Sequence, residues 1–268
     1  MVRPKGGKGI ISGLTAPTAL AAVAAVVVMG AIASCTRKAG TPAQAPAAAS
    51  ALYGKGTIRG IAVWQGAAPA PEEIKMSGDP QCAARHKGGK LVNQSVIVGP
   101  NKGLANVLVR VIEGIPADAN YPAPDYVAEL DQNGCAYSPR LVAIQRGQKI
   151  RFKNSDQMLH NVHSLSKVNE GFNFSMPGSL PISDPKVFDK AEGIFTVKCD
   201  IHPWMQAFVA VSAHPFFTVT GADGTYTISN LPSGTYLVEG WHEKGGSLVY
   251  QIKVKDGEMG TVNFPFGG

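Results

Sequence analysis

The sequence has few charged and few aromatic residues. Of its 268 residues, 16% are charged and 7% are aromatic, while 44% are hydrophobic. Long runs of lysine and arginine are also lacking, although the formal net charge is +6. Nucleic-acid-binding domains carry such basic clusters, so the composition argues against nucleic acid as a partner. The same composition suits one or two packed domains with a real hydrophobic core.

Two common hydrolase motifs are absent as well. The chain contains no His-Glu-x-x-His helix motif of zinc proteases and no Gly-x-Ser-x-Gly motif of serine hydrolases. A sustained helical period of 3.6 residues is also missing. We therefore expect a protein that is not an enzyme of either class and that is not built from helices.

The first 34 residues have the pattern of a secretion signal. Basic residues lie among the first eight positions, and an apolar stretch rich in alanine and valine follows them up to Cys35. The ending Ile-Ala-Ser-Cys resembles a bacterial lipobox. That resemblance implies a cleaved signal peptide (1–34), a lipid on Cys35 and a flexible tether (35–54).

An uncleaved membrane anchor is the alternative for this segment. Both interpretations place the folded part outside the cytoplasm, on the periplasmic side or at the cell surface. Thr36 follows the cysteine, which by resemblance favours the outer membrane if the source has two membranes. Removing three basic residues with the signal would lower the net charge from +6 to +3.

Beyond residue 54, apolar and polar residues alternate between Gly, Pro and Asn-Gly turns. Residues 149–153 and 194–199 alternate cleanly, and the second stretch places Phe195, Val197 and Cys199 on one face. This period of two predicts an all-β fold whose alternating faces are buried between two sheets.

The strongest chemical signal is a Cys-x2-His-x2-Met motif at the end of one such strand. It consists of Cys199, His202 and Met205, and His160 precedes it by 39 residues. A thiolate, two imidazoles and a thioether suit copper in a trigonal site with a weak axial methionine. A chance coincidence without any metal is the alternative. His163 faces away from His160 on an extended strand, so we expect it at the surface or behind the ligands.

At these residues the chain resembles the cupredoxins, or blue copper proteins, and among them the amicyanin- and plastocyanin-like group. The resemblance covers residues 126–212 and implies a Greek-key sandwich (124–213). It also implies one type 1 copper held by His160, Cys199 and His202 with Met205 as axial ligand. Asn161 would connect the two ligand loops near Asp200, where many relatives have Ser or Thr. His202 would emerge through an apolar docking patch that includes Pro203, Trp204 and Met158.

With Cys35 assigned to lipid and Cys199 to copper, Cys82 and Cys135 remain. In an oxidising compartment we expect a disulfide between them. A second metal site made of Cys82 and His86 is the alternative, but a Cys-x3-His spacing without further clustered ligands is a weak signal.

The flanking segments form a second module. Residues 221–238 show two alternating stretches joined by a Leu-Pro-x-Gly turn, and they resemble the carboxypeptidase regulatory-like, or prealbumin-like, β-sandwich. Apolar stretches at 56–63 and 104–111 would supply its first strands. We therefore expect a sandwich formed by residues 55–113 and 214–268 with the cupredoxin inserted, and two sequential domains as the alternative.

Together these features predict a membrane-anchored, extracytoplasmic copper protein that carries single electrons between redox proteins. The runner-up is a lipoprotein that stores, delivers or senses copper without redox cycling. Multicopper oxidases need His-x-His pairs and a binuclear electron-entry site needs two loop cysteines, neither of which the chain has. We therefore expect no enzymatic activity.

Overall fold

The computed structural model describes residues 52–76, 78–86 and 90–267. The expected signal peptide, the Cys35 lipid site and most of the 35–54 tether lie outside the described residues. Within the described part, strands dominate, and α1 (Pro80–Arg85) and the short 3-10 helix η1 (Pro100–Lys102) are the helices. The expected all-β sandwich fold is confirmed. No helix in this part is long and apolar enough to cross a membrane.

Strands from the two ends of the described chain form one pair of sheets, which we call the terminal sandwich. Its sheets have the orders β13-β1-β16, with β17 also paired to β1, and β12-β2-β14-β15. Its strands are β1 (Gly56–Trp64), β2 (Leu108–Glu113), β12 (Phe217–Val219), β13 (Thr225–Leu231), β14 (Gly234–His242), β15 (Gly246–Val254), β16 (Met259–Thr261) and β17 (Phe264–Phe266).

Strands from the middle of the chain form a second pair of sheets, the central sandwich. The sheet orders are β5-β11-β10-β7-β8 and β4-β3-β6-β9. Its strands are β3 (Ala128–Gln132), β4 (Tyr137–Ser138), β5 (Leu141–Gln145), β6 (Lys149–Asn154), β7 (His160–Ser164), β8 (Asn173–Met176), β9 (Lys186–Val187), β10 (Glu192–Lys198) and β11 (Gln206–Ser212).

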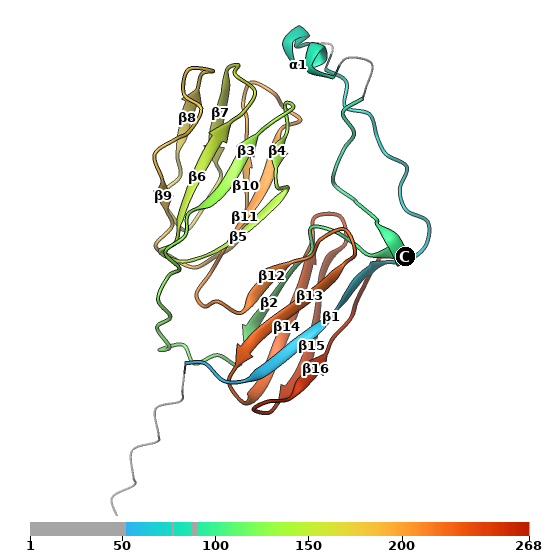
Figure 1. Cartoon of the computed structure of the whole chain (residues 1–268), viewed down its shortest axis with the longest axis vertical. Coiled ribbons are helices and arrows are strands. Elements are labelled where there is room, and N and C mark those ends of the chain that lie inside the picture. Colours follow the sequence, from blue (N-terminus) through green and yellow to red (C-terminus); the bar gives the residue numbers. More distant parts are fainter. Residues whose placement is uncertain (1–51, 77, 87–89, 268) are drawn as a thin grey trace, which may run out of the picture. The chain divides into compact units, whose positions relative to one another are not determined.

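The strand pairing makes the central sandwich an insertion in the chain. β1 pairs antiparallel with β13 and parallel with β16 and β17. In Figure 1 the blue strand β1 accordingly lies among orange and red strands, while the central sandwich is green to yellow and orange. The terminal sandwich is therefore closed by residues from before and after the inserted strands.

Alternation explains how the strands of the central sandwich bury one face. Phe195 and Val197 of β10 are buried, while Thr196 and Lys198 between and after them are partly exposed. These side chains join a hydrophobic cluster that fills the central sandwich and contains Cys199 and Met205. The sulfur atoms expected to bind metal thus belong to residues of the core itself.

A long connection between β1 and β2, residues 65–107, reaches from one sandwich to the other, and we call it the arm. Its Met76, Cys82 and Leu91 belong to the core cluster of the central sandwich, whereas Leu104 belongs to that of the terminal sandwich. A disulfide joins Cys82 in α1 to Cys135, with a Cα–Cα distance of 5.8 Å. The predicted disulfide is confirmed, so Cys82 is not available for the alternative metal site with His86.

Candidate metal centre

The loop after β10 brings three of the four expected ligand residues to one end of the sheet. Cys199 directly follows β10, which is paired with β11 along its whole length. The Cys199 N–H donates to the Met205 carbonyl at 3.0 Å, and the Met205 N–H donates to the His202 carbonyl at 2.8 Å. These two bonds close the loop at its base, and the side chains of Cys199, His202 and Met205 are all buried.

His160 reaches the same place from the neighbouring strand. It is the first residue of β7, which pairs antiparallel with β10. The Nδ1 atoms of His160 and His202 are 3.0 Å apart, and Cys199 Sγ is 3.6 Å from the Nδ1 of His202. The ligand atoms of these three buried residues all lie within 4.8 Å of one another. One metal ion can therefore be held by all three.

Hydrogen bonds prepare the thiol of Cys199 to act as a thiolate. Burial by itself raises the pKa of Cys199, but hydrogen bonds from His160, from the backbone N–H of Asn161 and from His202 outweigh it. They lower the pKa to about 6, from an ordinary value of 9.0. The thiolate is the form that binds metals, so the pocket favours the ligating state before any ion arrives.

The buried carboxylate of Asp156 contacts the Nε2 atom of His160. The Nε2 of His160 lies 3.0 Å from Asp156 Oδ2, and neither side chain is exposed. Asp156 also accepts the backbone N–H groups of Gly134 and Cys135 at 2.7 and 2.8 Å, and Arg85 of the arm lies 3.6 Å away. Burial opposes ionisation of Asp156, yet the hydrogen bonds from His160 and from these amides hold its pKa below the ordinary value. A carboxylate in this position fixes the ring so that Nδ1 faces the thiol.

The second histidine has a carboxylate partner of its own, supplied by the arm. The Nε2 of His202 lies 2.8 Å from Asp79 Oδ2, and the side chains are 1% and 23% exposed. The backbone N–H of Cys82 donates to the other oxygen of Asp79, and this bond is the first cause of its lowered pKa. Both imidazoles therefore present Nδ1 to the cluster and Nε2 to a carboxylate.

The carboxylate of Asp200, the residue after Cys199, contacts several polar side chains. The Asp200 N–H donates to Asn161 Oδ1 at 2.6 Å, and the Asn161 amide donates to Asp200 Oδ2 at 3.1 Å. His163, Asn173 and Lys198 also contact the Asp200 carboxylate, at 2.8–2.9 Å. These contacts hold the pKa of Asp200 well below its usual range, with Lys198 as the largest cause. The structure thus places Asn161 as a connection between β7 and the ligand loop.

The surface around His202 differs from the exposed docking patch expected from the sequence. His202 is only 1% exposed and Met158 only 8%, whereas Pro203 is exposed and Trp204 partly exposed. The physical reason is the arm, whose Asp79 contacts the His202 ring. Met158 lies against Cys135, with a sulfur–sulfur distance of 3.7 Å. The expectation that His202 and Met158 reach the surface is wrong.

Sequence reasoning missed Asp79 and Asp156. Asp156 follows a strand and precedes His160 by four residues, and Asp79 precedes Pro80 as an N-cap residue typically does. Those local signals indicate a turn and a short helix. Neither of them indicates a contact with a candidate metal ligand, because both contacts depend on the tertiary arrangement.

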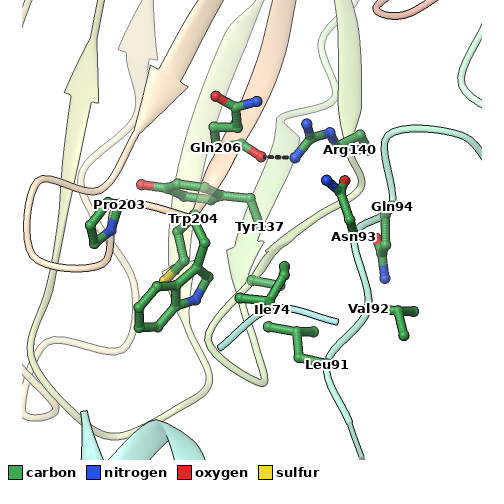
Figure 2. Close-up of a pocket in the computed structure, with 12 residues that line it drawn as sticks. Ile74, Leu91, Val92, Asn93, Gln94, Tyr137, Arg140, Pro203, Trp204 and Gln206 are labelled. Atoms are coloured by element: carbon green, nitrogen blue, oxygen red, sulfur yellow. Dashed lines mark hydrogen bonds between the residues drawn. The ribbon is translucent and has the colours of Figure 1, made fainter. Parts of the chain in front are cut away.

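A pocket of about 210 Å³ lies beside the ligand loop (Figure 2). The guanidinium of Arg140, which borders it, already donates to the Gln206 carbonyl at 2.8 Å and to both carboxylate oxygens of Glu243 at 2.7 Å. The pocket therefore presents no uncompensated charge to a ligand. Its lining residues are Ile74, Leu91, Val92, Asn93, Gln94, Ala136, Tyr137, Arg140, Pro203, Trp204, Met205 and Gln206.

No protein-family model matches the chain, and no curated protein matches it. Solved structures with local similarity include a copper-containing nitrite reductase from Thermus scotoductus, at 19% identity and a TM-score of 0.30 over 37% of this chain. That match spans only 25% of the reductase chain. A purple cupredoxin from Nitrosopumilus maritimus shows 25% identity and a TM-score of 0.27 over 32% of this chain and 99% of its own. Amicyanin from Paracoccus versutus shows 22% identity and a TM-score of 0.28 over 39% of this chain and 97% of its own.

Proposed function

We propose that this chain is a cupredoxin-type electron carrier that binds one type 1 copper ion in its central sandwich. The observation that supports this most directly is the convergence of a buried thiol and two buried imidazoles, whose ligand atoms lie within 4.8 Å of one another. These donors come from two paired strands and a hydrogen-bonded loop, so their positions are set by the sheet.

The chemistry of the donors fits copper. His160, Cys199 and His202 would be the equatorial ligands, and Met205, buried in the same core cluster as Cys199, the weak axial ligand. When bound, copper supplies a centre that accepts and releases one electron. The chain supplies ligands that hold nearly the same positions in both redox states, because Asn161, Asp156 and Asp79 restrain the groups around them.

The remaining parts of the chain support a role outside the cytoplasm. A disulfide between Cys82 and Cys135 suits an oxidising compartment. We propose that Cys35 carries a lipid anchor on the periplasmic side or cell surface and that the terminal sandwich is a prealbumin-like docking module. The electron donor and acceptor are then redox proteins, and the chain itself is not an enzyme.

One observation favours a second candidate, a protein that holds or delivers copper without cycling. His202 is almost fully buried beneath the arm, and a covered ligand suits retention of an ion better than electron exchange with a partner at the surface. Reversible reduction separates the two functions, because only a carrier must pass between both redox states under mild conditions.

The test uses the full chain, purified in detergent and loaded with Cu(II). We expect an intense thiolate-to-copper absorption in the red that ascorbate bleaches and a mild oxidant restores. Cys199→Ser should abolish the band, whereas Cys35→Ser, which leaves the ligand set intact, should keep it. A band that persists in Cys199→Ser contradicts the ligand assignment, and a band that ascorbate destroys irreversibly favours the copper-holding candidate.

A further inference from the structure

We infer that the arm completes the metal site and that Asp79 is a positioning residue for the ligand His202. This inference rests on the proposed copper function and extends it to a segment far from the ligands in the sequence. The observation behind it is the Asp79 Oδ2 contact with His202 Nε2 at 2.8 Å, across 123 residues of sequence.

The two oxygens of Asp79 have separate tasks. One accepts the Cys82 N–H at 2.9 Å and caps α1, while the other faces the His202 ring. A histidine that binds metal through Nδ1 carries its proton on Nε2, so His202 must donate to the carboxylate. The carboxylate fixes the rotation of the ring and keeps Nδ1 directed at Cys199 and His160.

Asp79 is held in place by the packing of the arm rather than by His202 alone. Cys82, three residues later, is disulfide-bonded to Cys135. His86 at the end of α1 lies 2.8 Å from the Gly134 carbonyl through Nε2. On either side of the helix, Met76 and Leu91 are buried in the core cluster of the central sandwich. The carboxylate is therefore preorganised before a metal ion binds.

Two consequences follow for a bound ion. The carboxylate makes the imidazole a stronger donor and places a negative charge close to the metal, so it favours Cu(II) over Cu(I). It also restricts His202 to one orientation, and loss of such a partner typically weakens metal binding by about 10- to 100-fold. The arm is thus expected to lower the reduction potential and to retain the ion.

Asp79→Ser separates the two tasks of this residue. Serine is a good helix N-cap, so the variant keeps the cap on α1, but its side chain is too short to hold the His202 ring. Glu73→Ser is the matched control, since it removes one negative charge from the same arm. Glu73 pairs with Lys90 at the surface and is not among the residues that contact a ligand.

Two measurements on the full chain in detergent test the inference. The first is NMR of the metal-free, ring-labelled protein, where we expect a slowly exchanging Nε2–H proton of His202 that is lost in Asp79→Ser and kept in Glu73→Ser. The second is copper loading, where Asp79→Ser should keep the red band, bind Cu(II) about 10- to 100-fold more weakly and show a more positive reduction potential.

The outcomes distinguish this inference from the proposed function. If Asp79→Ser matches Glu73→Ser in Cu(II) affinity and potential, Asp79 does not position the ligand and the inference is wrong. If the unmodified chain shows no thiolate-to-copper band, the electron-carrier function fails, and the same pair of variants is compared by Zn(II) affinity. A weaker Zn(II) affinity in Asp79→Ser alone would then still support the positioning role, and equal affinities would refute it.

Discussion

Replacing Cys82 and Cys135 together with alanine should destabilise the central sandwich by about 4 kcal/mol. The disulfide closes a loop across a sequence separation of 53 residues. In the chain-entropy model, a cross-link over a loop of that length restricts the unfolded chain by about 4 kcal/mol at 25 °C. Alanine avoids placing a hydroxyl group where both cysteines are fully buried.

The assay is urea unfolding of the metal-free chain, followed by the fluorescence of Trp204. Its indole N–H donates to the Cys135 carbonyl at 3.0 Å, so this tryptophan reports on the region next to the disulfide. The other two tryptophans, Trp64 and Trp241, are replaced by phenylalanine in every protein compared. Without the disulfide, the transition should move to a lower urea concentration.

Chemical reduction of the parent protein is the control, because it breaks the same cross-link without changing any residue. The reduced parent and the double-alanine variant should unfold at nearly the same urea concentration. A loss below about 1 kcal/mol in both would refute the reasoning, since it would mean that residual structure in the unfolded chain already restricts it as much as the disulfide does.

Two further predictions concern the metal site and the stability of the same sandwich. Met205→Gln should keep the red band of the copper-loaded chain but lower its reduction potential in voltammetry, because a harder axial oxygen favours Cu(II); a potential that does not move would remove Met205 from the ligand set. Glu192 is partly buried, which raises its pKa, but hydrogen bonds from Ser166 and from backbone amides of residues 167 and 168 lower it below the ordinary value of 4.5. Its contribution to stability is therefore complete above pH 4.5 and is lost as the pH falls through the lowered pKa. Glu192→Gln should cost about 1–3 kcal/mol at pH 7 in urea unfolding and progressively less as the pH is lowered below 4.5, and a cost that does not change with pH would contradict this.

The ligand loop was predictable because its signals are local. Alternation over residues 194–199 predicts a strand that points Phe195, Val197 and Cys199 to one side, and the burial of these residues agrees. The motif then places His202 and Met205 within one short turn of Cys199. His160 lies on a different strand, β7, and only the pairing of β7 with β10 brings it next to Cys199. Its place in the site was therefore predicted from the resemblance to a known ligand corner.

The covering of the site was not predictable from the same signals. The arm around α1 carries no regular period, and its buried residues Met76 and Leu91 belong to short apolar groups of two residues in a polar stretch. Elimination among four cysteines predicted that Cys82 joins Cys135, but it did not show that this link lies beside the ligand loop. Consequently the sequence predicted an exposed His202, whereas Asp79 covers it.

The charges around the site explain why a distant arm would matter to the proposed copper centre. A divalent ion, the Cys199 thiolate, the carboxylates of Asp79 and Asp156 and the guanidinium of Arg85 together have a formal charge of zero. A monovalent ion leaves one uncompensated negative charge among groups that are mostly buried, which is unfavourable in a medium of low polarity. The arm supplies both Asp79 and Arg85, so its docking sets part of this balance without changing any ligand. Because the balance favours the oxidised ion, a copper-loaded chain with the arm in place should give up its electron more readily than one in which Asp79 has been removed.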